Sequence, residues 1–223
     1  MCGRYHLSAT ALAQIQNADA LTLNSELTFD MNEVWNSSEM PSRDICPSDF
    51  SPVLLYQNNR LVLRMMQWGF PNPQGRNLII NARAETVTDK RMFGSIFSRR
   101  CVIPAEKYYE WDADRNKAIF SYRHNPQWCQ SQESNKDKSP DTYKKTLYLA
   151  GFYDLHDGID RFVILTTDAN ESVRCVHDRM PLILEEEEVE RWLSDNTYWR
   201  EVLKKEPPEL ERFQEYEQQC FVW

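Results

Sequence analysis

Many short β-prone runs, separated by polar turn residues, are the feature that most constrains how this 223-residue chain folds. Runs of about four to eight residues rich in aliphatic, aromatic and β-branched side chains are typical of strands. Such runs stand at Ser51–Tyr56, Leu61–Trp68, Leu78–Asn81, Arg100–Pro104, Tyr108–Trp111, Ala118–Tyr122, Thr146–Tyr153, Arg161–Thr166 and Pro181–Leu184. The polar residues Gln57–Arg60, between the first two runs, predict a hairpin turn.

Helical patterns are fewer and short. They stand at Ser8–Leu21, where Ser8 is the predicted N-cap, and at Ala84–Phe93, Ala169–Val173, Glu185–Leu193 and Tyr198–Lys205. Many strands with helices at the periphery predict one α+β domain over residues 1–223, because alternating βαβ units would need a helix between successive strands. Asn125–Lys145 is polar and longer than an ordinary hairpin loop, so we expect a mobile insertion there.

Composition and motif content exclude several classes of protein. No apolar stretch reaches the roughly eighteen residues that a membrane-spanning helix needs. The first residues lack the apolar core of a secretory signal, so we expect the protein to stay in the cytoplasm. The six cysteines are widely spaced without a C-x-x-C pair, which favours free thiols over disulfides or a zinc site. P-loop, dinucleotide-binding, zincin and serine-hydrolase motifs are absent from the sequence.

Charge is distributed unevenly along the chain. The net charge is −8, which by itself disfavours a nonspecific nucleic-acid binder. Residues 60–107, however, carry nine lysines and arginines against three acids, and residues 185–217 carry twelve acids against five basic residues. A local basic surface attracts a phosphate backbone, although the same residues could form a solvated face of mixed charge.

Cys2 is the most informative single position. Initiator methionine is generally removed when the second residue is small, and removal would leave Cys2 with an α-amine and a thiol on adjacent carbons. Such a 1,2-aminothiol forms a Schiff base with an aldehyde and then closes a thiazolidine ring. As a terminal residue, Cys2 is expected to be exposed and to contribute little packing. The alternative is an inert unpaired cysteine.

Four polar clusters interrupt the apolar runs. Asn81–Thr86 follows a predicted strand and could be part of a site or ordinary turn chemistry. Glu110 lies within an aromatic run, where burial would raise its pKa, or it faces outward from an edge strand. His177 precedes an apolar strand and could also be a structural histidine. Trp68, in an exposed-looking turn, could stack on a base or cap the core.

Six segments occur together in a specific order along the chain. They are Met1–Tyr5, Trp68–Gly69, Asn81–Thr86, Arg99–Ala105, Tyr109–Trp111 and His177–Pro181. Each is a weak motif alone, but their joint occurrence is specific. In this order they resemble the SOS response-associated peptidase (SRAP) family, the abasic-site processing proteins.

The resemblance implies both a fold and a reaction. The fold is a single SRAP domain of the α+β class, with a β-barrel-like mixed or antiparallel sheet and peripheral helices. The reaction is a covalent thiazolidine cross-link between Cys2 and the aldehyde of an abasic site in single-stranded DNA, with lyase-like Schiff-base chemistry, which protects the site during the DNA damage response. No metal or organic cofactor is implied, and a monomer is expected.

The resemblance also assigns roles to individual residues. Asn81 would position the open sugar and the N-terminal amine, Glu110 would serve the proton transfers, and His177 would assist Schiff-base chemistry and reversal. The implied DNA contacts are Arg4, Arg83 and Arg179, which would hold phosphates, and Trp68, which would stack near the site.

Two alternative functions remain open on the sequence. Cys2 could act as an N-terminal cysteine hydrolase or peptidase with His177 as base, including autoproteolytic removal of Met1. A noncatalytic DNA-binding module would need no free N-terminus. The basic middle of the chain favours a DNA function over a peptidase, because a peptidase has no need for phosphate-binding arginines.

Overall fold

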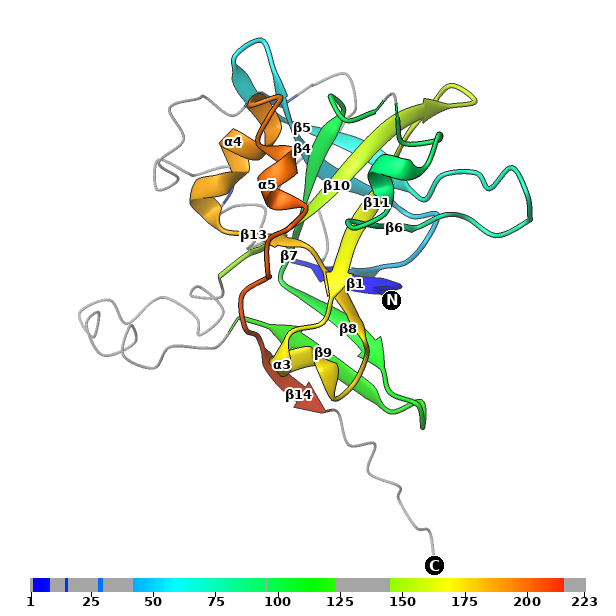
Figure 1. Cartoon of the computed structure of the whole chain (residues 1–223), viewed down its shortest axis with the longest axis vertical. Helices are drawn as coiled ribbons and strands as arrows, with labels where there is room; N and C mark the ends of the chain where they lie inside the picture. The colour runs from blue at the N-terminus through cyan, green and yellow to red at the C-terminus, as the bar shows by residue number, and fades with distance from the viewer. Residues whose placement is uncertain are drawn as a thin grey trace, which may run out of the picture.

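Five strands close into a barrel at the centre of the molecule (Figure 1). The computed structural model describes residues 2–8, 15, 28–29, 42–94, 96–122 and 145–214. The barrel strands are β4 (Phe50–Gln57), β5 (Arg60–Trp68), β7 (Arg100–Ala105), β10 (Leu147–His156) and β11 (Ile159–Asp168). Neighbours pair antiparallel in the order β11-β10-β7-β4-β5, and β5 then pairs with β11 in parallel, which closes the ring.

Short strands extend the barrel sheet. They are β2 (Thr28–Phe29), which pairs with β5; β6 (Asn81–Arg83) and β12 (Arg179–Pro181), which pair with β11; and β13 (Ile183–Leu184), which pairs with β10. In the register, β6 lies opposite residues 164–166 of β11, and β12 lies opposite residues 166–168. Both strands therefore meet the same end of β11.

A second sheet has the order β14-β9-β8-β1-β3. Its strands are β1 (Arg4–Leu7), β3 (Arg43–Ile45), β8 (Lys107–Trp111), β9 (Lys117–Ser121) and β14 (Glu211–Gln214). Figure 1 shows β8, β9 and β14 in the lower part of the molecule, with β1 between them and the barrel. The strand that follows Cys2 is thus an interior strand, paired on both edges.

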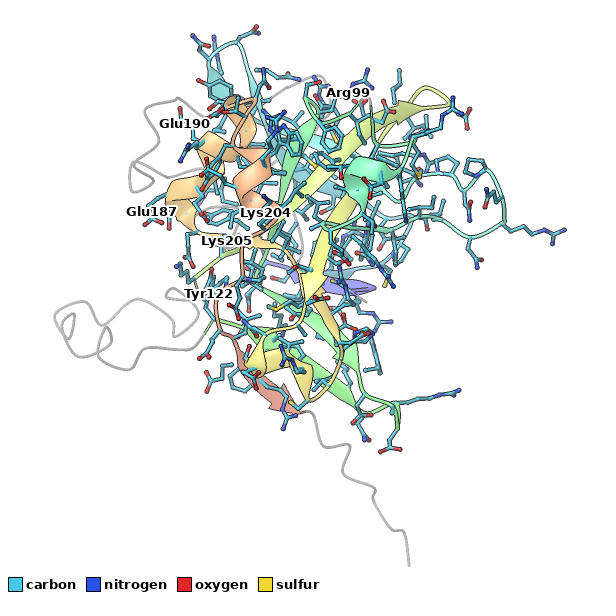
Figure 2. All side chains as sticks on the ribbon, in the orientation of Figure 1. Arg99, Tyr122, Glu187, Glu190, Lys204 and Lys205 are labelled. Atoms are coloured by element: carbon cyan, nitrogen blue, oxygen red, sulfur yellow. The ribbon has the colours of Figure 1, made fainter. Side chains whose placement is uncertain are left out.

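The helical elements between residues 42 and 214 of the described part are short and lie outside the barrel. They are η2 (Val87–Asp89), α3 (Glu171–Arg174), η4 (Glu186–Glu188), α4 (Val189–Ser194) and α5 (Trp199–Val202). Helix α4 is joined to β7, because the Trp192 indole donates to the Cys101 carbonyl over 3.0 Å and Arg100 donates to the Leu193 carbonyl over 3.2 Å. Glu187 and Glu190 point outward from this helical side (Figure 2).

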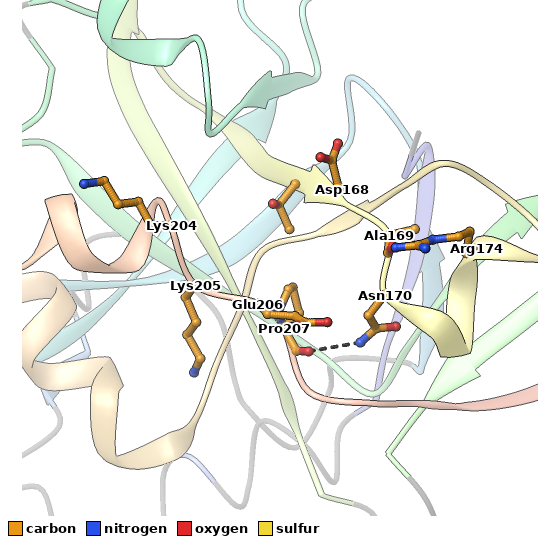
Figure 3. A pocket seen from close by; sticks show the side chains of 9 residues that line it. Asp168, Ala169, Asn170, Arg174, Lys204, Lys205, Glu206 and Pro207 are labelled. Carbon is orange, nitrogen blue, oxygen red and sulfur yellow. Dashed lines mark hydrogen bonds between the residues drawn. The ribbon is translucent and has the colours of Figure 1, made fainter.

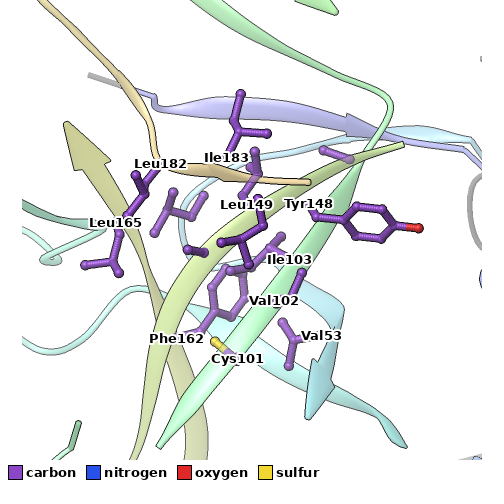
Figure 4. Packing of buried hydrophobic residues seen from close by; sticks show 14 of the residues in the cluster. Val53, Cys101, Val102, Ile103, Tyr148, Leu149, Phe162, Leu165, Leu182 and Ile183 are labelled. Atoms are coloured by element: carbon purple, nitrogen blue, oxygen red, sulfur yellow. The ribbon is translucent and has the colours of Figure 1, made fainter. Parts of the chain in front are cut away.

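The barrel interior is filled by aliphatic and aromatic side chains from alternate strand positions (Figure 4). Ile103, Leu149 and Phe162, which share one face of the sheet in the register, are all fully buried. Gly151 lies where a β-carbon would come within 2.6 Å of the Ile103 side chain and of the Val163 carbonyl. Glycine at this position therefore lets three strands pack closely.

The α+β barrel expected from the sequence is confirmed, and most strands lie where they were predicted. The hairpin at Gln57–Arg60 is confirmed as well: Asn58 and Asn59 both have positive φ, 53° and 60°. Asparagine tolerates this conformation, which a tight two-residue hairpin requires at both central residues. The four described cysteines, Cys2, Cys46, Cys101 and Cys175, are free thiols.

Several boundaries differ from the prediction. The strand expected at Leu78–Asn81 begins only at Asn81, because Ile79 forms an isolated bridge with Phe70 and the Ile80 carbonyl accepts from the Trp68 indole. Pro181–Leu184 is divided between β12 and β13, which pair with different strands. Strands β1, β2, β3 and β14 were not predicted.

The predicted helices also differ. Ala84–Phe93 contains only the short η2, and α3 and α5 are shorter than predicted, whereas η4 and α4 together cover residues 186–194, close to the predicted Glu185–Leu193. The helix predicted at Ser8–Leu21 lies outside the described residues except for Ser8 and Ile15, and so does nearly all of the insertion predicted at Asn125–Lys145.

Candidate functional site

Cys2 is held inside the protein at the start of β1. Its side chain is completely buried, so the exposed position expected from the sequence is wrong. The Asn81 side-chain amide donates a hydrogen bond of 2.9 Å to the Cys2 carbonyl, and the Cys2 Sγ lies 3.8 Å from the Arg4 carbonyl. Burial, with a further contribution from the charge of Glu110, raises the pKa of the Cys2 thiol far above its ordinary value. The thiol is therefore protonated at neutral pH.

Glu110 lies on β8, the partner strand of β1, and only 2% of its surface is exposed. Burial raises its pKa to about 7 from an ordinary 4.5, although the positive N-terminal amine opposes the shift. The outward-facing alternative for Glu110 is wrong, because β8 is paired with both β1 and β9 and this side chain faces inward. A carboxyl group with a pKa near neutrality can both donate and accept a proton.

His177 lies in the turn between α3 and β12. The Arg179 backbone N–H donates to the His177 Nδ1 over 3.0 Å, and the Asp178 carboxylate lies 2.8 Å from the same nitrogen. Burial, followed by the charge of the N-terminal amine, lowers the pKa of His177 below its ordinary value. The neutral ring is therefore favoured over the imidazolium.

The structure brings the four predicted catalytic residues to one place. Asn81 donates a hydrogen bond to the Cys2 carbonyl, and the charge of Glu110 contributes to the raised pKa of the Cys2 thiol. The charge of the N-terminal amine acts on the pKa of both Glu110 and His177. The topology explains the meeting: β6 and β12 pair with the same end of β11, while β8 pairs with β1. A thiol, an amide, an acid and an imidazole thus surround the start of the chain.

Residues 1–219 match the family model described as SOS response associated peptidase (SRAP). The chain belongs to the SRAP family. It is 30% identical to abasic site processing protein YoaM of Bacillus subtilis over 175 residues, which cover 74% of this chain and 72% of that protein. It is 25% identical to abasic site processing protein YedK of Escherichia coli over 218 residues, covering 94% of this chain and 85% of that protein.

The fold is also that of solved structures. A protein from Bacteroides thetaiotaomicron aligns with a TM-score of 0.67 and 21% identity, over 97% of this SRAP chain and 93% of its own. A phage-related protein from Bordetella bronchiseptica aligns with a TM-score of 0.65 and 20% identity, over 96% of this chain and 93% of its own.

The residues predicted to contact DNA in this SRAP protein differ in their exposure. Arg83 is exposed at the end of β6, and the Arg4 guanidinium lies over the Trp111 ring, 5.3 Å from its centre. The exposed stacking surface expected at Trp68 is wrong. Trp68 is fully buried, packs between Tyr5 and Phe162, and donates its indole N–H to the Ile80 carbonyl over 2.9 Å, so it caps the core.

The phosphate contact expected at Arg179 stays a prediction, because the guanidinium is engaged by protein acceptors in this structure. Only 6% of the side chain is exposed, and its guanidinium donates to both Glu85 carboxylate oxygens over 2.8 and 2.9 Å. It also donates to Asp168 over 2.6 Å and to the Thr166 carbonyl over 2.8 Å. A phosphate could reach this guanidinium only by displacing protein acceptors.

Sequence reasoning missed two polar networks beside the site. Glu85 lies within the Asn81–Thr86 motif, and its position in a polar segment was the only local signal of a role. Asp44 accepts from the Tyr109 hydroxyl over 2.7 Å and lies 2.8 Å from the His6 Nδ1, so it links β3, β8 and β1. Nothing local marks Asp44, because its partners come from distant parts of the chain.

A surface pocket of about 260 Å³ includes Asp168, an acceptor of Arg179, in its lining (Figure 3). It is formed where the β11–α3 connection faces the segment that follows α5, and Asn170 joins the two by donating to the Pro207 carbonyl over 3.0 Å. None of the predicted site residues lines it. Within the described ranges, no three His, Cys, Asp or Glu side chains are grouped so that they could hold a metal ion. Nor is any helix of the described part long and apolar enough to cross a membrane.

Proposed function

We propose that this chain is an abasic-site processing protein of the DNA damage response. In this proposal, removal of Met1 exposes the amine and thiol of Cys2, which form a thiazolidine cross-link with the ring-opened aldehyde of an abasic site in single-stranded DNA. The main support is the anchoring of Cys2 by Asn81 next to a buried acid whose pKa is about 7. An inert cysteine needs neither partner. The names of the SRAP relatives, abasic site processing proteins, support the same function.

The proposed reaction joins the aldehyde to two nucleophilic atoms of one residue. The neutral amine of Cys2 attacks the aldehyde carbon and forms a carbinolamine, whose hydroxyl leaves as water to give an iminium. The Cys2 sulfur then adds to the same carbon and closes the five-membered ring. Overall, aldehyde and aminothiol give thiazolidine and one water, whose two hydrogens derive from the N–H and the S–H.

Glu110 is suited to both proton transfers of this sequence. In its acid form it gives a proton to the departing hydroxyl, and the resulting carboxylate accepts the proton of the Cys2 thiol as the sulfur adds. The thiol needs such a base, because burial keeps its pKa far above neutrality. His177, neutral at pH 7, is positioned to exchange protons with the amine and to assist reopening of the ring. The buried Asn81 Oδ1, which has no hydrogen-bond partner among the described residues, is available to accept a hydrogen bond from the open sugar.

The DNA is proposed to reach the site along Arg4 and Arg83, with no cofactor and with the protein acting as a monomer on DNA in the cytoplasm. Both arginines can donate to phosphates without breaking a buried ion pair. Arg179 is a third proposed phosphate contact, which would exchange protein acceptors for phosphate oxygens, whereas the buried Trp68 is not part of this proposed surface.

The decisive experiment combines intact mass with adduct formation. The purified protein should lack Met1, and incubation with an abasic single-stranded oligonucleotide should give a heat-stable adduct whose mass equals the sum of both partners minus one water. Cys2→Ala should abolish the adduct, and Cys2→Ser should give at most a Schiff base that borohydride traps. A heat-stable adduct with Cys2→Ala, or none with the Met1-free wild type, would refute the proposal.

The family description favours a second activity, peptidase chemistry, for the same thiol. In this chain it would be autoproteolytic removal of Met1, with His177 as base. Synthesis in a cell-free system without methionine aminopeptidase tests it: a mass without Met1 supports autoproteolysis, and retention of Met1 refutes it.

A further inference from the structure

Tyr108 shares the buried face of the second sheet with Glu110. It lies on β8, directly opposite Tyr5 on β1 and Phe120 on β9. Residues that lie opposite each other in a sheet point to the same face, and so do residues two apart along one strand. Tyr5, Tyr108, Glu110 and Phe120 therefore share one face, and each of them is almost completely buried.

The Tyr108 side chain is buried, but its hydroxyl is not satisfied. The ring stacks on Phe120, with ring centres 5.2 Å apart and ring planes 21° apart. No part of the side chain is exposed, and the hydroxyl has no hydrogen-bond partner among the described residues. A buried hydroxyl that loses its bonds to water and gains none in return destabilises the folded protein. Such a group in a folded protein therefore needs an explanation.

The Cys2 thiol lies near the same sheet face. Burial raises the pKa of Tyr108 well above its ordinary value, and the charges of Cys2 and Glu110 add to the shift. Burial likewise raises the pKa of Tyr5, with a further contribution from the charge of Cys2. The charge of Glu110 contributes in turn to the raised pKa of the Cys2 thiol. Three side chains of one buried face thus interact with the thiol, and Tyr108 is the one with an unused hydroxyl.

A phenol in this position is suited to donate a hydrogen bond to a charge that exists only briefly. Because its pKa is raised, the Tyr108 hydroxyl keeps its proton at neutral pH and can act as a donor. In the proposed reaction, negative charge develops on the Cys2 sulfur as Glu110 takes the thiol proton. Before that step the protonated thiol is only a weak acceptor. An acceptor that appears during the reaction accounts for a hydroxyl without a partner in the free protein.

We propose that Tyr108 is a catalytic residue of ring closure, whose hydroxyl donates a hydrogen bond to the Cys2 sulfur as that sulfur adds to the iminium carbon. In this step the S–H bond breaks, its proton goes to the Glu110 carboxylate, and the sulfur electron pair forms the C–S bond. Tyr108 transfers no atom. A donor fixed in advance where charge develops lowers the barrier without reorganisation. The inference rests on the proposed function, because it concerns one step of that reaction.

Tyr108→Phe removes the hydroxyl and keeps the ring that stacks on Phe120. The matched control is Tyr122→Phe, because the Tyr122 hydroxyl is also buried and without a partner among the described residues. Burial raises the pKa of Tyr122 as well, but the charges that add to this shift are chiefly those of Glu185 and Glu188 rather than that of Cys2. The control thus removes the same kind of hydroxyl away from the thiol.

Two assays on abasic single-stranded DNA separate the two bonds that the proposed reaction forms. Tyr108→Phe should form the heat-stable adduct about 10- to 100-fold more slowly than wild type, the range for one hydrogen bond to a charged group. In Cys2→Ser protein, where only a Schiff base is expected, adding Tyr108→Phe should leave the rate of borohydride trapping unchanged, because attack by the amine does not involve the sulfur. Tyr122→Phe should match wild type in the first assay and Cys2→Ser in the second. Equal slowing of both reactions by Tyr108→Phe, or no slowing of the first, would overturn the proposal.

Stability gives a readout that does not depend on activity. If the Tyr108 hydroxyl has no partner in the free protein, the urea midpoint of Tyr108→Phe should equal or exceed that of wild type. A lower midpoint would show that the hydroxyl is bonded within the protein and would contradict the proposal.

A small aldehyde separates the role of Tyr108 from the proposed function. If wild type forms no adduct with abasic DNA, the proposed function fails, and thiazolidine formation between Cys2 and glyoxylate, followed by intact mass, decides the role of Tyr108. Slower closure in Tyr108→Phe than in wild type and Tyr122→Phe would support the assignment. Equal rates, or no thiazolidine in wild type, would refute it.

Discussion

Replacing Glu110 by glutamine should stabilise the protein at alkaline pH while it impairs the proposed reaction. Glu110 is almost completely buried, and its pKa of about 7 means that the folded protein binds the proton more tightly than the unfolded chain does. The contribution of this group to stability is therefore fully present below about pH 4.5 and is lost as the pH rises through 7. Glutamine has the same shape and never acquires the charge.

The size of the effect follows from the two pKa values, 4.5 for the ordinary carboxyl group and about 7 for Glu110. Each tenfold difference in proton affinity corresponds to about 1.4 kcal/mol, so the full change is about 3 kcal/mol. Relative to wild type, the free energy of unfolding of Glu110→Gln should rise by about this amount from acid to alkaline pH, mostly between pH 5 and 7. At pH 8 the slowing of adduct formation should be about 10²- to 10⁴-fold.

Urea unfolding of both proteins at pH 5, 6, 7 and 8, followed by tryptophan fluorescence, measures this difference. Glu187→Gln is the control, because that residue is exposed on the helical side and the variant makes the same change of side chain at the surface. A difference between Glu110→Gln and wild type that stays constant from pH 5 to 8 would refute the reasoning. It would mean that Glu110 is already ionised at pH 5.

Three further outcomes are expected. Arg83→Glu should weaken binding of single-stranded DNA regardless of base sequence and should reduce the slope of log Kd against log salt, whereas unchanged binding would make Arg83 only a solvated residue. His177→Ala should slow release of a preformed adduct, chased with excess competing abasic DNA, at least as strongly as its formation; equal rates in wild type and variant would remove His177 from the mechanism. Gly151→Ala should lower the free energy of unfolding by about 1 to 3 kcal/mol, because the new methyl group meets the Val163 carbonyl at 2.6 Å. Gly94→Ala, with no contact closer than 3.5 Å, should change it by less than about 1 kcal/mol in the same denaturation assay.

The sequence by itself determined the elements whose signals are local. The strands β4 and β5 follow from alternation and β-branched content, and their hairpin follows from two asparagines that accept positive φ. The candidate catalytic residues Cys2, Asn81, Glu110 and His177 were found through their motifs. Their order along the chain, rather than any single spacing, pointed to the SRAP family.

Only the tertiary structure decided which side chains are buried and what they contact. The partners of Arg179 and Asp44 lie far away in the sequence, 94 positions for Glu85 and 38 for His6. Strand β1 was not predicted because its residues acquire a strand conformation through pairing with β3 and β8 rather than from local preference. Trp68 and Cys2, which a sequence places at a turn and at a terminus, are buried because the closed barrel and the second sheet enclose them. Burial is a property of the whole packed chain, and it is burial that raises the pKa of Glu110 and encloses the Arg179 guanidinium among protein acceptors.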